Sequence, residues 1–381
     1  MTKKRKKLFL VQVVGFDKVN SEQCKFEKLR SVSIRNMNIN DTPVEIASTV
    51  PSLRDIDLSE NLLRSWINLA AILGQVPLRI LNVSLNLLPV PEVVPVEQFS
   101  HLVHLILGDM GYGWTELELL AGDLPQLEIL QAHRNQVQEI LVSDRKFLKL
   151  KELDLDCNKI SDWEQVRNLD KIVNLENLRL NGNQISDLVL VPGQFKNLRV
   201  LQLSENLLEN WSQISQLNHL NVTELRLRNN PVLLREKYEV CRQIIIALVQ
   251  SIKILNGSTL VENERSWAEL DYYKKHGLEY LKILKLPEPE RTEALQSFSV
   301  QHGRYLEIVE RLGVPEEAEL TVRESNLKAS LVSVKVRCPE VPGSADTGKK
   351  LPVSMTVAKL KALVGRLYRY KNKRTYYMKA F

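Results

Sequence analysis

The residues able to do chemistry in this sequence are scattered and lack catalytic spacing. His104 and His133 fall in neighbouring repeats, but histidine neighbours on a strand face are common by composition, so we expect no metal site there. Asp154 and Asp156 point the same way on an expected strand, yet no acid or base in a distinct environment accompanies them. The motifs GxxxxGK[ST], HExxH and GxSxG are absent. We therefore predict no enzyme, no cofactor and no metal.

The cysteines and the charge balance exclude further classes of protein. Cys24, Cys157, Cys241 and Cys338 are far apart without a CxxC pair, which favours a reducing, cytoplasmic compartment over a disulfide scaffold. The net charge of +6, from 52 basic and 46 acidic residues, is concentrated at the two ends. A uniformly basic nucleic-acid-binding protein is not expected.

The start of the chain imitates a signal peptide, with five basic residues before a short apolar run. Gln12 interrupts that run and no small-residue cleavage site follows, so we expect a strand over 8–16 instead. Nowhere does an apolar run approach the roughly 18 residues that a membrane span needs. We interpret the basic segments 3–7 and 366–379 as tails. An RNA-binding role for both ends is the alternative, and it would give steeply salt-dependent binding.

A repeat sets the expected fold. The pattern L-x-x-L-x-L-x-x-N-x-L occurs nine times, at spacings of 24, 25, 24, 25, 23, 25, 23 and 24 residues. The copies begin at Leu29, Leu53, Leu78, Leu102, Leu127, Leu150, Leu175, Leu198 and Val222. Such periods are typical of a leucine-rich-repeat solenoid of the α/β class, in which stacked units share one core. The repeated asparagine is interpreted as structural, bonding backbone groups inside the turn.

A longer period accompanies the repeat. Trp66, Trp114, Trp163 and Trp211 recur in every second repeat, each before helix-spaced apolar residues. Phenylalanines recur in the other repeats, and the prolines after Leu88 disfavour a helix there. The outer side of the solenoid should therefore alternate helical and extended segments, with the aromatic side chains packed between them.

The remaining segments complete the domain organisation. We predict an N-terminal cap over 1–28, repeats over 29–233, a helical C-terminal cap over 234–281 with a helix from Tyr238 to Val249, and a helical linker over 282–326. Strands within 331–340 and 349–357 and a helix over 357–367 follow. They are similar to the start of a ubiquitin-like β-grasp domain, so 327–381 is expected to form a partial one.

The segments ELDYYKKHG, FSVQHGRYLEIVERLGVPEEAEL and LPVSMTVAKLKALVGRL, together with the repeats, resemble the tubulin-folding cofactor E family from about Val11 to Leu367. The resemblance implies a non-enzymatic chaperone that captures α-tubulin and, with other tubulin-folding cofactors, assembles or dissociates the α/β heterodimer. No glycine-rich CAP-Gly segment precedes Val11, and the ubiquitin-like part stops early. The cofactor E-like family, which lacks CAP-Gly, is the competing assignment.

The concave face of the repeats is the expected binding surface, because alternation turns the residues between and after the strand leucines outward. The predicted partner-binding residues are Asp55, Asp57, His104, Gln131, His133, Glu152, Asp154, Asp156, Arg179, Asn181, Gln202, Glu224, Arg226 and Arg228. We expect a monomer, cytoplasmic and associated with the cytoskeleton, that binds neither nucleic acid nor membrane. A generic regulatory scaffold of the phosphatase-regulator or spliceosomal type is the alternative, and it should lack any ubiquitin-like segment.

Overall fold

The computed structural model describes residues 25–40, 46–320, 331–336 and 347–352. The chain divides after Val314 into two compact units, and each is described by itself. The expected strand over 8–16 lies outside the described residues, and so does the helix expected over 357–367.

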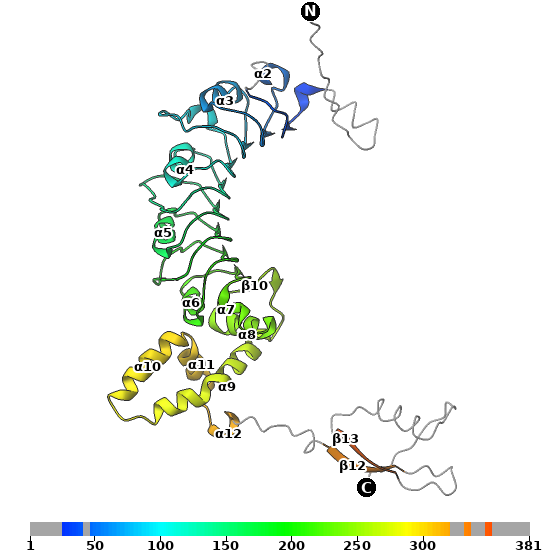
Figure 1. Ribbon diagram of the computed structural model, residues 1–381, viewed down its shortest axis with the longest axis vertical. Helices are drawn as coiled ribbons and strands as arrows, with labels where there is room; N and C mark the ends of the chain where they lie inside the picture. The colour runs from blue at the N-terminus through cyan, green and yellow to red at the C-terminus, as the bar shows by residue number, and fades with distance from the viewer. Residues whose placement is uncertain (1–24, 41–45, 321–330, 337–346, 353–381) are drawn as a thin grey trace, which may run out of the picture. The chain divides into compact units, whose positions relative to one another are not determined.

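The first unit is built on one sheet to which every repeat contributes a single short strand (Figure 1). The strands are β1 (Ser31–Ser33), β2 (Asp55–Asp57), β3 (Ile80–Asn82), β4 (His104–Ile106), β5 (Ile129–Gln131), β6 (Glu152–Asp154), β7 (Asn177–Arg179), β8 (Val200–Gln202), β9 (Glu224–Arg226), β10 (Ile254–Leu255) and β11 (Ser258–Thr259). Neighbours from β1 to β10 pair in parallel, and β11 closes the sheet antiparallel. The predicted leucine-rich-repeat solenoid is confirmed.

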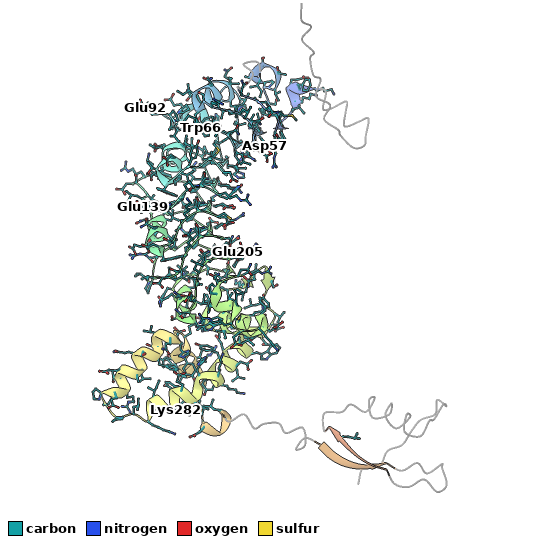
Figure 2. All side chains as sticks on the ribbon, viewed as in Figure 1. Asp57, Trp66, Glu92, Glu139, Glu205 and Lys282 are labelled. Carbon is teal, nitrogen blue, oxygen red and sulfur yellow. The ribbon has the colours of Figure 1, made fainter. Side chains whose placement is uncertain are left out.

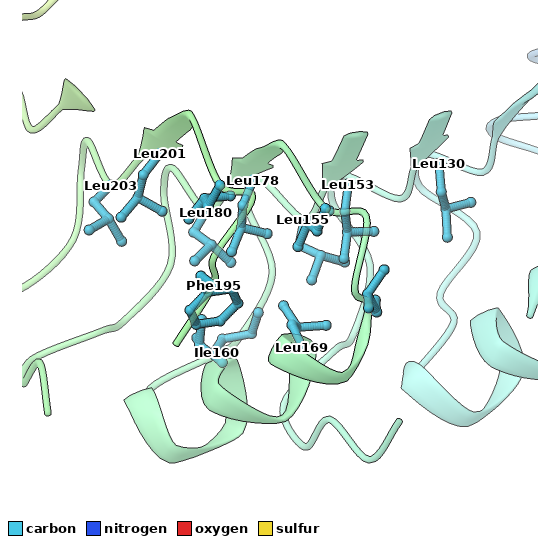
Figure 3. Packing of buried hydrophobic residues seen from close by; sticks show 14 of the residues in the cluster. Leu130, Leu153, Leu155, Ile160, Leu169, Leu178, Leu180, Phe195, Leu201 and Leu203 are labelled. Atoms are coloured by element: carbon cyan, nitrogen blue, oxygen red, sulfur yellow. The ribbon is translucent and has the colours of Figure 1, made fainter. Parts of the chain in front are cut away.

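The leucines of the pattern form a continuous core beneath this sheet. Leu130, Leu153, Leu178 and Leu201 project from consecutive strands into the same interior (Figure 3), and each is fully buried. The strands are short because each repeat supplies only one buried leucine within its strand and a second just after it. The stack therefore buries apolar surface that a single repeat would leave exposed.

The repeated asparagines have the structural role expected of them. Asn158 is buried, its amide group donates to the carbonyl oxygens of Ala132 and Leu155, both at 3.0 Å, and its oxygen accepts from Val137 N at 3.1 Å. Asn61, Asn86, Asn135, Asn183, Asn206 and Asn230 are buried and bonded in the same way. Each asparagine thus links the turn of its own repeat to the preceding one.

The outer side alternates as the tryptophan period predicts. The helices that start at the four tryptophans are α3 (Trp66–Leu73), α4 (Trp114–Ala121), α5 (Trp163–Arg167) and α6 (Trp211–Gln216). The proline-rich repeat has only the short 3-10 helix η2 (Glu97–Phe99). Trp66 packs edge-on against Phe99 at 6.2 Å between ring centroids, and Trp114 lies 5.7 Å from Phe147. Tryptophan and phenylalanine therefore fill the space between successive outer segments.

Shorter elements complete the repeats. They are η1 (Phe26–Lys28), α2 (Ile46–Thr49), η3 (Asn168–Lys171), η4 (Leu217–His219) and α7 (Pro231–Leu234). In Figure 2, Asp57 and Glu205 lie on the strand side of the array, and Glu92 and Glu139 lie on the opposite, outer side.

The C-terminal cap is larger than predicted. It contains α8 (Tyr238–Leu248), which matches the predicted helix, and α9 (Glu264–Leu284). The segment expected as a helical linker, 282–326, begins inside α9 and contains α10 (Glu290–Gln301) and α11 (Tyr305–Leu312), helices that agree with the expected helical character of this segment. Phe298 and Tyr305 are buried in the same core as Tyr272 and Tyr280 of α9. Residues up to Val314 therefore belong to the repeat unit, because an aromatic core joins them to the cap.

The second unit starts at Pro315 and contains α12 (Glu317–Leu320) and a two-stranded antiparallel sheet. Its strands are β12 (Leu331–Val336) and β13 (Thr347–Pro352), paired from Leu331 with Pro352 to Val336 with Thr347. An antiparallel pair at this place agrees with the first two strands that we expected. The described helices include none that is long and apolar enough to cross a membrane.

Candidate functional site: the concave face of the repeats

The structure places all the predicted binding residues on one face, in three rows that cross the strands. Parallel register puts Gln131 beside Asp154, Asp154 beside Arg179, and Arg179 beside Gln202. The first positions of the strands form the second row, and the residues two places beyond each strand form the third. The first row, at the third position of each strand, contains Asp57, Gln131, Asp154, Arg179, Gln202 and Arg226. The second row contains Asp55, His104, Glu152 and Glu224, and the third contains His133, Asp156, Asn181 and Arg228.

Arg179 is the centre of an ion-pair cluster on this face. Its guanidinium lies 2.8 Å from Glu152 Oε1 and 3.7 Å from Asp154 Oδ2, both on the neighbouring strand β6. Burial raises the pKa of Asp154, against the opposing effects of the Asp156 backbone amide, His133 and Arg179. Two acids predicted to face a partner are thus already engaged inside the protein.

A hydrogen-bond chain fixes the third row. Asn181 donates from its backbone nitrogen to Asp156 Oδ1 at 2.6 Å and from its side chain to Asp156 Oδ2 at 3.1 Å. The same amide reaches Gln202 Oε1 at 3.0 Å, while Asn181 Oδ1 accepts from Ser204 N at 2.9 Å. Three consecutive repeats are therefore linked through side chains on the concave face, which holds the surface in one conformation.

The basic end of the face is partly neutralised by its own neighbours. Arg226 pairs with Glu224 at 3.2 Å within β9, and Arg228 donates to the Asn256 carbonyl oxygen at 2.9 Å. At the other end, Asp57 accepts from the backbone and hydroxyl of Ser59 at 2.9 and 2.6 Å. Charge is thus distributed in internally satisfied groups rather than in one basic and one acidic half.

The two histidines of the face lie in different surroundings. Burial lowers the pKa of His104, and its Nε2 atom has no hydrogen-bond partner among the described residues. The His133 ring covers Gly108, where an added Cβ would lie 2.4 Å from His133 Nε2. A side chain at position 108 and the observed His133 position exclude each other, so a substitution of this glycine requires the imidazole to move.

Sequence reasoning missed a row of arginines along the edge where the strands begin. Arg30, Arg54 and Arg79 follow the first leucine of three consecutive repeats, and all three are exposed. They border a shallow groove whose lining residues are Arg30, Arg54, Asp55, Arg79, Ile80, Val103, His104 and Ile129. The signal was present in the sequence as L-R at the same position of three repeats. These arginines lie one position before the strands, whereas the predicted binding residues begin with the first residue of each strand.

Comparison with known proteins identifies the family. No family model matches the chain. The chain is 33% identical over 375 residues to Tubulin-specific chaperone E of Bos taurus, covering 94% of this chain and 70% of that protein. The chain belongs to the tubulin-specific chaperone E family. Another relative is Tubulin-specific chaperone E of Xenopus laevis, 32% identical over 374 residues, with 94% of this chain and 71% of the relative covered.

Membership in the tubulin-specific chaperone E family extends beyond animals. Tubulin-folding cofactor E of Arabidopsis thaliana is 28% identical over 384 residues, covering 95% of this chain and 70% of the plant protein. Among solved structures, the chain is similar to internalin C2 of Listeria monocytogenes, with TM-score 0.39 and 20% identity over 54% of this chain and 83% of that one. A leucine-rich-repeat protein of Leptospira interrogans gives TM-score 0.41 and 26% identity over 60% and 55% of the two chains. The family resemblance predicted from the cap and linker segments is confirmed.

Proposed function

We propose that this chain is a non-enzymatic tubulin-folding cofactor that holds α-tubulin against the concave face of its repeats. Membership in a family whose relatives are named for tubulin supports the choice of partner. The proposal includes assembly or dissociation of the α/β heterodimer together with other tubulin-folding cofactors. It places the chain in the cytoplasm, associated with the cytoskeleton, as a monomer.

The observation that carries the proposal is the set of polar rows running across consecutive strands. The ion pairs of Arg179 and the hydrogen bonds of Asn181 hold these rows before any partner arrives. A pre-organised surface loses little side-chain entropy on binding, so more of the contact energy is retained as affinity. Alternating charges along such a surface orient a charged partner.

The arginine row supplies the charges that remain free for a partner. Arg54 and Arg79 are exposed, and neither forms an ion pair with another described residue. Because neighbouring strands are about 4.8 Å apart, these guanidinium groups present closely spaced positive charge to an acidic segment. Arginine also suits carboxylates geometrically, since two of its N–H groups bond one carboxylate together.

Binding of the cofactor to an unpaired tubulin subunit would shift the folding and dimerisation equilibria of that subunit without any covalent reaction. A partner held in its folded state is stabilised in proportion to the logarithm of the cofactor concentration over the dissociation constant. Different affinities for the free subunit and for the paired heterodimer would then set whether the cofactor favours assembly or dissociation.

The test is capture of purified α-tubulin by variants of the full chain. Arg54→Glu combined with Arg79→Glu should weaken capture at least tenfold, because it reverses charge on the arginine row without touching the core. Lys149→Glu combined with Lys196→Glu gives the same change in net charge at exposed positions outside both the three rows and the arginine row and should leave capture unchanged. Equal capture by both double variants would reject the arginine row as part of the binding surface. Asp154 and Arg179 are unsuitable test positions because their loss would disturb the fold.

A further inference from the structure

Two histidines and a glutamate converge where the last helices of the repeat unit meet. His276 and Glu279 lie one turn apart on α9, and His302 directly follows α10. Glu279 Oε2 lies 3.9 Å from His276 Nδ1 and 3.7 Å from His302 Nε2. One ligand atom from each of the three residues lies within 4.8 Å of the other two. The three donor atoms therefore lie close enough to one another to contact a single ion.

The surrounding side chains hold the two imidazoles in place. Tyr272 OH and His302 Nδ1 are 2.8 Å apart, which leaves His302 Nε2 directed at Glu279. The two histidine rings pack at 4.0 Å between centroids, and Phe298 lies 4.5 Å from the His302 ring. A hydrogen bond to the second ring nitrogen is the usual way in which a protein orients a metal-binding histidine.

We propose that His276, Glu279 and His302 bind a zinc ion. Two imidazole nitrogens and one carboxylate are a common ligand set for zinc, with bonds of about 2.0–2.2 Å. Tetrahedral ligands at that distance lie about 3.4 Å from one another. Glu279 now lies 3.7 and 3.9 Å from the two histidine nitrogens and all three ligand atoms lie within 4.8 Å of one another, so binding requires the side chains to move closer together. Three protein ligands leave one coordination position for water or a partner's donor atom.

The electrostatic surroundings keep the histidines in the form that binds a metal. Burial lowers the pKa of His276 to about 3, with further effects from His302 and Lys275. Burial also lowers the pKa of His302, Glu279 opposing this and Lys275 adding to it. A neutral imidazole offers a lone pair to a cation. The positive charge of Lys275 disfavours a bound cation, and the negative charge of Glu279 compensates for it. Glu279 is also half exposed, so an ion can reach it from solvent.

Zinc at this position would join α9 to the turn between α10 and α11. That contact is where the cap folds back on itself, and a bound ion would stabilise the folded state without contributing to the unfolded one. The proposal concerns the cap alone and is independent of tubulin binding.

The experiment is calorimetric titration of metal-free full-length protein with Zn²⁺, followed by thermal unfolding with and without Zn²⁺. We expect one saturable site and a rise in melting temperature. Glu279→Gln should weaken Zn²⁺ binding at least tenfold and reduce that rise, because it removes the charged ligand from an exposed position that carries no core packing. Asp271→Asn, an exposed acid on the same helix, should bind Zn²⁺ as the wild type does.

Two results would overturn the proposal. One is the absence of a saturable site in the wild type at micromolar Zn²⁺. The other is equal binding by the wild type and Glu279→Gln, which would assign the ion to scattered surface carboxylates. A second variant, His276→Gln, keeps the site testable if the histidines also matter for packing, since its circular dichroism spectrum reports folding separately from Zn²⁺ affinity.

Discussion

Arg304 and Glu269 form a buried ion pair that fastens the last helices to the cap. Arg304 Nη1 lies 3.1 Å from Glu269 Oε1, and the side chains are only 5% and 2% exposed. The same nitrogen donates to the Ala247 carbonyl oxygen at 2.6 Å, near the end of α8. Arg311 binds the second carboxylate oxygen of Glu269. The carboxylate is thus shared by two arginines that lie before and within α11.

Breaking this pair should weaken the packing of α10 and α11 against α9. Glu269→Ala leaves Arg304 charged and buried, which costs about 3–5 kcal/mol. We expect a lower midpoint in urea unfolding and faster amide hydrogen exchange in α11 than in the wild type. Glu307→Ala removes the more exposed partner of Arg304 and should change stability by less than about 1 kcal/mol. Unchanged exchange in α11 after Glu269→Ala would contradict the docking role.

The buried asparagine of each repeat should contribute substantially to the free energy of unfolding. Asn158→Ala leaves the Val137 amide without its partner, while the carbonyl oxygens of Ala132 and Leu155 lose one bond each and keep the bonds from Asn135 and Asn183. The unpaired amide costs about 1–3 kcal/mol and each of the two lost bonds about 0.5–1.5 kcal/mol, so the variant should lose at least about 2 kcal/mol in equilibrium unfolding. The matched control is Asn174→Ala, an exposed asparagine with a single bond to Leu148 O, which should lose less than about 1 kcal/mol. Similar losses of stability from both substitutions would contradict the structural role of the buried asparagines.

These roles also mark what the sequence could and could not predict. The strands and the asparagine ladder were predictable because each depends on the identity of one residue at a fixed position in a repeat. The pairing of Asp154 with Arg179 follows from the same register, although its burial does not. In contrast, Pro287 and Pro289 favoured a linker, because local composition gives no sign of partners far along the chain.

The docked helices depend on contacts that cross long stretches of sequence. Arg304 meets Glu269 across 35 residues, without any repeat to fix their spacing. The cluster of His276, Glu279 and His302 was invisible for the same reason: His302 comes from a different element, and only the folding back of α10 places it near α9. Features that recur at a fixed position in every repeat could therefore be predicted from the sequence. Features that depend on a single contact between distant residues could not.

The buried carboxylate of Asp154 should make stability depend on pH. Burial raises the pKa of Asp154 in the folded state above its ordinary value. The folded protein therefore holds this proton more tightly than the unfolded chain, so stability from this group is present in acid and is lost as pH rises through the folded-state pKa. Asp154→Asn removes this ionisation while keeping an acceptor for the Asp156 amide. The melting temperature of the variant relative to the wild type should rise from pH 3 towards neutrality. A difference in melting temperature between variant and wild type that does not change with pH would contradict the raised pKa of Asp154.

The contact between Gly108 and His133 can be tested by a double-variant cycle on the concave face. Gly108→Ala introduces a Cβ where His133 Nε2 would lie 2.4 Å away, so the imidazole has to move or the strand has to shift. Because the clashing atoms are the far end of a half-buried side chain, we expect the cost to lie at the low end of the about 1–3 kcal/mol that overpacking of a core costs. His133→Ala frees that space, so adding Gly108→Ala to it should cost much less than in the wild-type background. Equilibrium unfolding of both single variants and the double variant gives the coupling energy. If the two losses simply add, the imidazole does not occupy the surface of Gly108, and the arrangement of this part of the face is wrong.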